Sequence, residues 1–176
     1  QSKDLRLAFF LTCALLRVGV GPGDDVIPAR YIAGLTLGFQ LLKGMMETFW
    51  DDMHPSVPSR WASLAALASD DVTFPIRQVP LTKWGHGHKH YFEWLRNIEP
   101  ETKPGEEDVL WSGNFEEGFG ETDLEFYVRL SEELESCAST LEALEESGRE
   151  RFKEAGEPPP SYSDLKKALR DMSAAA

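Results

Sequence analysis

The feature that constrains the fold most is a repeat of apolar residues from Tyr127 to Leu144. Its members follow one another at alternating steps of three and four. The members of this stripe are Tyr127, Leu130, Leu134, Cys137, Leu141 and Leu144. Such spacing keeps one side of a helix apolar along its whole length and predicts a long amphipathic helix packed against a partner. Thr122 and Glu125 have the spacing of a capping box, which places the start of the helix there. We expect its end near residues 152–155.

The other faces of this helix are acidic. They include Glu132, Glu133, Glu135, Glu142, Glu145, Glu146 and Glu150. A row of carboxylates could act as a ligand row, but a run of charge beside an apolar stripe is usually the solvated side of a helix. We therefore interpret these glutamates as solvent-facing.

Two apolar segments precede the acidic helix. The first is expected to start at Ser2, a favourable cap for the first turn. It is apolar on almost every side over residues 7–16, which predicts a central core helix. The second is expected over residues 28–50. Gly34 and Gly38 lie on one face of it, and we expect them to allow close approach of the first helix.

The remaining helices are shorter. One is expected over residues 59–68 with Trp61 facing inward, and a last one is expected to begin at Ser161 or Ser163. Between them, residues 70–120 lose periodicity and are rich in proline, glycine and aromatic residues. The predicted fold class is all-α: an irregular helical bundle with two central apolar helices, a long aromatic-rich loop region and a long acidic amphipathic helix.

The net charge of the chain limits the kinds of molecule that it is expected to bind. The formal net charge is -12, and an acidic surface repels phosphate, so nucleic acid and anionic membranes are poor partners. The longest uncharged helical run, residues 31–42, is shorter than the roughly 20 residues that a spanning helix needs. Cys13 and Cys137 lie in apolar surroundings and are expected to be buried thiols in a reducing compartment.

Three histidines, His86, His88 and His90, form the most tempting chemical cluster. In an extended segment they would present three imidazoles on one face, as a zinc site requires. Gly85 and Gly87 loosen that geometry, and no cysteine or carboxylate stands at a convincing fourth position. A solvated polar loop that holds no metal is the favoured interpretation.

Asp51, Asp52 and His54 form a second candidate, because a carboxylate beside an imidazole can serve as an acid/base pair. They follow a predicted helix and precede Pro55, so a role at the end of that helix is the simpler interpretation. No phosphate loop, dinucleotide fingerprint or nucleophile elbow accompanies them. The sequence therefore predicts no catalytic residues and no cofactor.

Several motifs together resemble the ImpA N-terminal region. They are SKDLRLA at residues 2–8, GFQLLKG at 38–44, FWDDMHP at 49–55, Arg60 in the following helix, and PSYSDL at 160–165. The resemblance covers most of the chain and implies a TssA/ImpA-type protein of the bacterial type VI secretion system. Such proteins are cytoplasmic, non-enzymatic assembly factors. They engage the baseplate and membrane complex and help to prime or cap the tail tube and sheath.

The resemblance also implies an organisation. Residues 1–176 are expected to form a single ImpA N-terminal-like helical domain, a fragment of a longer chain whose C-terminal domain oligomerises. The intact protein is then expected to be homo-oligomeric, and the isolated domain a monomer or dimer.

Two sets of residues are singled out. The fold-signature residues are Asp4, Arg6, Trp50, Asp51, His54 and Pro55, and the candidate partner-contact residues are Trp84, Tyr91 and Trp94. Asp4 and Arg6 are expected to pair with neighbouring helices, and Trp50 to wedge between them. Two other hypotheses stay open: a metal-dependent enzyme that uses the three histidines, and a helical adaptor unrelated to secretion.

Overall fold

The computed structural model describes residues 3–18, 28–82 and 118–176, and the secondary structure in these ranges is helical. The elements are α1 (Leu5–Val18), α2 (Pro28–Phe49), α3 (Val57–Ala65), the short 3-10 helix η1 (Ala66–Ala68), α4 (Asp70–Arg77), α7 (Leu124–Glu154) and α8 (Ser163–Ala175). The prediction of an all-α fold is confirmed. Across the described ranges, no helix has the length and apolar character needed to cross a membrane.

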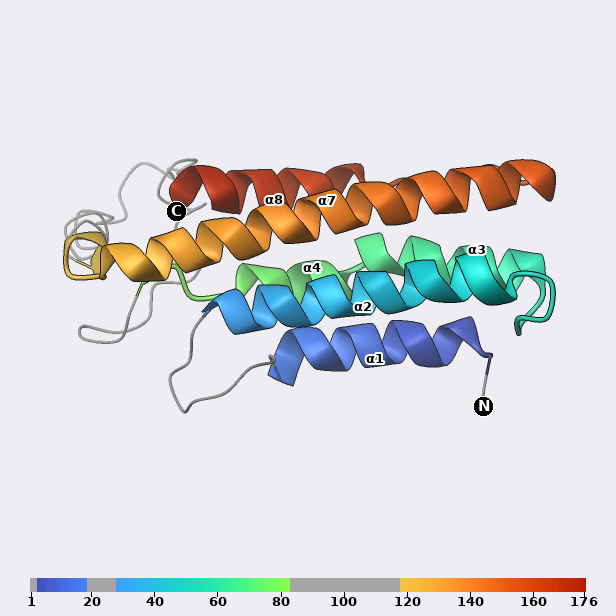
Figure 1. Cartoon of the computed structure of the whole chain (residues 1–176), viewed down its shortest axis with the longest axis horizontal. Coiled ribbons are helices and arrows are strands. Elements are labelled where there is room, and N and C mark those ends of the chain that lie inside the picture. The colour runs from blue at the N-terminus through green and yellow to red at the C-terminus, as the bar shows by residue number, and fades with distance from the viewer. Residues whose placement is uncertain (1–2, 19–27, 83–117) are drawn as a thin grey trace, which may run out of the picture.

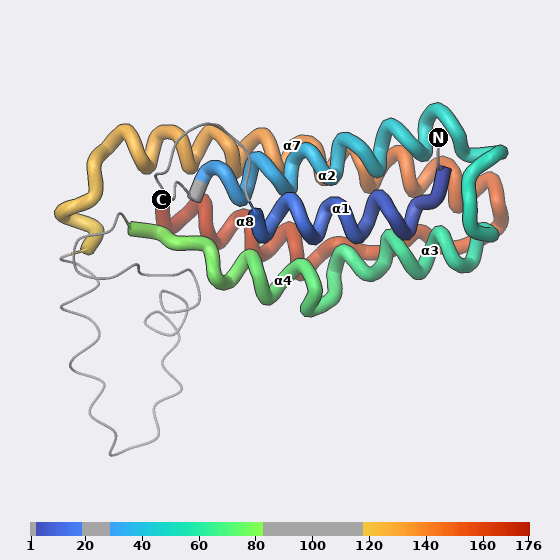
Figure 2. Tube along the Cα trace, turned by 90° about the horizontal axis from the view of Figure 1, so that it is seen from below, coloured from blue at the N-terminus to red at the C-terminus, as the bar shows by residue number. Residues whose placement is uncertain are grey.

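The helices run side by side along the long axis of the molecule and form a closed ring around one core. Helix α2 lies between α1 and α7, as Figure 1 shows, and α8 packs on α7. The ring closes because α8 contacts η1 and α4, while α3 and α4 contact α1. Figure 2 shows α3 and α4 along the side of the bundle opposite α2 and α7. Each helix is therefore a wall with an inner and an outer face.

The prediction of two central helices is wrong for α1. Its inner face is buried through Leu5, Phe9 and Leu16, yet Leu7 and Phe10 on its outer face are 56% and 63% exposed. The sequence of α1 is apolar on both sides, and periodicity alone cannot tell a central helix from a wall helix with an apolar outer face. Helix α2 is more fully enclosed, since a smaller share of its residues is exposed.

The start of α1 also differs from the expectation. The helix begins at Leu5, and its cap is Asp4 in place of Ser2, which lies outside the described residues. The Arg6 backbone N–H donates to Asp4 Oδ1 over 3.0 Å. A carboxylate at this position satisfies an amide that has no partner inside the helix and favours the positive end of the helix dipole.

Two glycines of α2 permit the close packing of α1, as predicted. A Cβ atom built on Gly34 would lie closer than 3.0 Å to the carbonyl of Leu15, and one on Gly38 would clash with the side chain of Thr12. The buried Thr12 hydroxyl donates to Ala8 O over 2.8 Å, so the contact leaves no polar group unsatisfied there. The contact therefore tolerates no side chain at either glycine.

Helix α4 occupies residues for which the sequence suggested loss of periodicity. Ser69 caps it, because its side chain accepts from the Asp71 N–H, and Val72 and Ile76, four residues apart, are buried. The helix has only eight residues and contains Pro75, which removes one backbone donor, so its apolar pattern is too short to stand out.

The third helix is close to its prediction, since α3 and η1 together cover residues 57–68. Leu64 and Leu67 are buried, but Trp61 is 37% exposed and was wrongly placed inward. Its indole N–H donates to Pro158 O over 2.9 Å. Trp61 therefore ties α3 to the connection between α7 and α8.

Helix α7 confirms the apolar repeat. Leu130, Leu134, Cys137, Leu141 and Leu144 are buried, and Tyr127 is half-buried. The predicted capping box does not form, because the Thr122 hydroxyl donates backward to Gly118 O and Asp123 precedes the helix.

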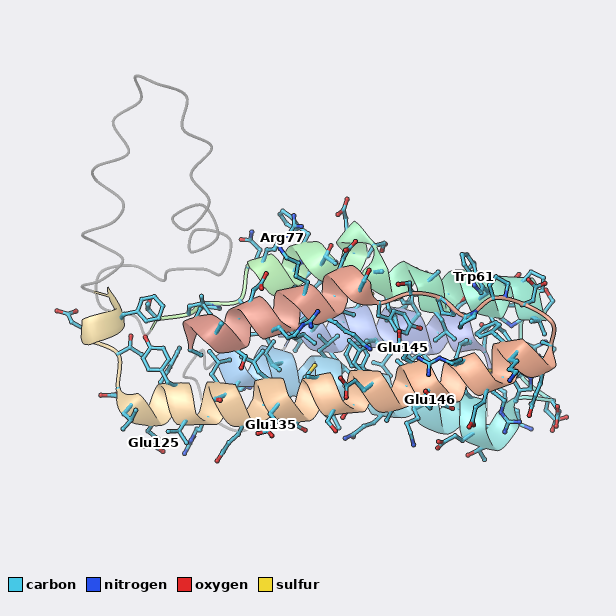
Figure 3. All side chains as sticks on the ribbon, turned by 90° about the horizontal axis from the view of Figure 1, so that it is seen from above. Trp61, Arg77, Glu125, Glu135, Glu145 and Glu146 are labelled. Carbon is cyan, nitrogen blue, oxygen red and sulfur yellow. The ribbon has the colours of Figure 1, made fainter. Side chains whose placement is uncertain are left out.

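The end of α7 depends on Gly156. This residue has a φ of 76°, which favours glycine, and the N–H of Glu157 returns to Phe152 O over 2.9 Å. Beyond it, α8 places Leu165, Leu169 and Met172 in the core. Figure 3 shows Glu145 on the α8 side of α7, where it pairs with Lys166.

The α1–α2 contact generates a prediction about glycine. Gly34→Ala should lower the free energy of unfolding by about 1–3 kcal/mol, because the new methyl group meets a backbone carbonyl that cannot rotate away. Gly44→Ala is the matched control: its Cβ meets nothing within 4 Å, so stability should stay constant or rise by up to about 1 kcal/mol. Urea denaturation measures both, and equal effects would contradict the close packing.

The buried thiol of α7 predicts a pH dependence. Burial raises the pKa of Cys137 from 9.0 to about 12. Its contribution to stability is complete below pH 9 and is lost as pH rises toward 12, because only the unfolded chain releases the proton. Each pH unit in this window removes at most about 1.4 kcal/mol.

Thermal unfolding at several pH values from about 8 to 11 would test this. Cys137→Ala should flatten the decline in Tm without abolishing it, because burial also raises the pKa of Tyr162. Parallel curves for parent and variant would show that Cys137 ionises freely in the folded protein.

Candidate functional site

Two of the sequence motifs meet at one end of the bundle, where the N-terminal residues lie beside the turn that follows α2 (Figures 1 and 2). The contact is a short parallel backbone bridge between Asp4 and His54. The Leu5 N–H donates to His54 O over 2.9 Å, and the His54 N–H donates to Lys3 O over 2.8 Å. We call residues 3–6 together with residues 49–60 the signature junction.

Asp4 and Arg6 pair with one another, not with neighbouring helices as the sequence suggested. Arg6 Nε donates to Asp4 Oδ1 over 3.0 Å, and its Nη2 donates to Oδ2 over 2.5 Å. These hydrogen bonds from Arg6 lower the pKa of Asp4, so the carboxylate stays charged as a cap. Both oxygens of Asp4 thus accept hydrogen bonds from Arg6.

Arg60 is the residue that holds the turn after α2. It is 7% exposed, and its guanidinium donates to Pro55 O over 2.6 Å, to Trp50 O over 2.6 Å and to Met53 O. Burial lowers the pKa of Arg60, yet an arginine remains charged throughout the physiological range. One side chain thus satisfies three carbonyl oxygens that have no helical partner.

Trp50 is buried at the same place. Its ring makes an edge-on contact with Phe152 of α7, with 5.3 Å between the ring centres, and the Arg60 guanidinium lies 4.9 Å from the Trp50 ring centre. Aromatic pairs and cation–ring contacts of this kind add to the hydrophobic stabilisation. Trp50 thus connects the turn to the long helix, as expected of a wedge between helices.

The exposed members of the junction show no acid/base arrangement. Asp51, Asp52 and His54 are exposed, and Asp52 pairs with Lys3 over 3.1 Å. Pro55 is half-buried, and its peptide bond to His54 is cis. The geometry supports a structural role for these residues at the end of α2.

Other sequence candidates lie elsewhere. The histidines His86, His88 and His90 fall outside the described residues, as do Trp84, Tyr91 and Trp94. Within the described ranges, no three His, Cys, Asp or Glu side chains gather as metal ligands would.

Most glutamates of α7 lie on solvated faces as expected, but Glu133 and Glu145 are half-buried, and Glu145 pairs with Lys166 of α8. Glu125 pairs with Arg129, and Glu146 pairs with Arg149, both within one turn of the helix. Figure 3 shows Glu125 and Glu135 on the outer side of α7. Exposed pairs of this kind contribute little to stability.

Comparison with known proteins supports the resemblance to the ImpA N-terminal region. Residues 1–69 match the family model described as ImpA, N-terminal, type VI secretion system. This part of the chain is similar to the ImpA N-terminal region. The matched range contains the whole signature junction, including Arg60, which the sequence analysis cited for the resemblance but did not place among its signature residues.

A solved structure is similar to nearly the whole chain. It is the N-terminal domain, including the conserved ImpA_N region, of the TssA component of the type VI secretion system from Burkholderia cenocepacia. The TM-score is 0.73 at 26% sequence identity, and the match covers 97% of this chain and 68% of that chain. No protein among the curated sequences matches the chain significantly.

The role of Arg60 was missed because its partners are backbone carbonyls, which leave no trace in the pattern of side chains. The available signal was a single arginine five residues after the histidine–proline pair, at a position of α3 that faces the core. Arg60 is therefore the residue that we add to the fold signature.

Arg60→Met should lower the free energy of unfolding by about 2–4 kcal/mol, because three carbonyl oxygens lose a charged donor. Arg60→Lys should rescue little, since an ammonium group cannot reproduce the planar fork. Arg129→Met is the control on α7, where an exposed pair with Glu125 is lost and the change should stay within about 0.5 kcal/mol. Guanidinium denaturation measures all three, and a similarly small loss for Arg60→Met and Arg129→Met would refute the role of Arg60.

Proposed function

We propose that this domain is a non-catalytic assembly module of the type VI secretion system. It works in the bacterial cytoplasm and docks onto baseplate, membrane-complex or tail tube and sheath components during tail assembly. The observation that carries this proposal is the match of residues 1–69 to the ImpA N-terminal family, together with the likeness to a TssA domain.

The geometry of the signature junction supports a binding role over catalysis. Three of its charged groups are engaged in holding the chain: Asp4 caps α1, Arg6 pairs with Asp4, and Arg60 binds backbone carbonyls. An active site needs a polar group directed at a substrate position. A module built in this way acts through the surface that its helices present, and by itself it is a monomer or dimer.

Affinity capture with the immobilised domain tests the proposal. A lysate of cells with an assembled type VI apparatus should yield baseplate, membrane-complex, tube or sheath proteins, identified by mass spectrometry. The control bait is Trp50→Ala, which removes a buried ring at the cost of about 3–5 kcal/mol and should lose the folded surface. Equal recovery of these components by both baits, or their absence from both, would refute the docking role.

A further inference from the structure

We draw no further inference here: the strongest candidate, the exposed apolar face that Leu7, Leu11 and Val18 form on the outer side of α1, carries none because nothing in the structure shows what covers it.

Discussion

The buried guanidinium of Arg60 is the interaction on which the rest of the bundle depends. A helix that ends and reverses within a few residues leaves carbonyl oxygens without donors, and burying them unpaired is costly. Arg60 supplies donors to three of them and lies against Trp50, which in turn contacts Phe152 of α7. Arg60 thus joins the start of α3 to the turn after α2 and, through Trp50, to α7.

The sequence predicted those features that depend on periodicity and size. The repeat from Tyr127 to Leu144 predicted α7 because a long apolar repeat stays recognisable even where single positions depart from it. Gly34 and Gly38 predicted the close α1–α2 contact because only glycine leaves the required space. Periodicity did not separate a central helix from a wall helix, so the outer face of α1 was misplaced, and Asp4 rather than Ser2 caps that helix.

The residues of the signature junction could be recognised from the sequence motifs, but the contacts that they make could not be derived from those motifs. Asp4, Arg6 and Trp50 were named from the resemblance, and their contacts depend on distances across the chain. Arg6 and Asp4 are only two residues apart, a spacing that gives no reason to expect a two-point pair on a helix face. Arg60 acts on backbone oxygens, which every residue carries, so no pattern of residue types marks its partners.

The same packing that fixes the bundle also fixes its outer surface. Thr12 and the backbone of Leu15 on α1 lie directly against Gly38 and Gly34 of α2, so the two helices approach closely only where α2 has no side chain. The orientation of α1 about its axis follows from this contact, which leaves Leu7 and Leu11 exposed while Leu5, Phe9 and Leu16 are buried. The two glycines of α2 therefore determine which apolar side chains α1 presents to solvent as well as how closely the helices pack.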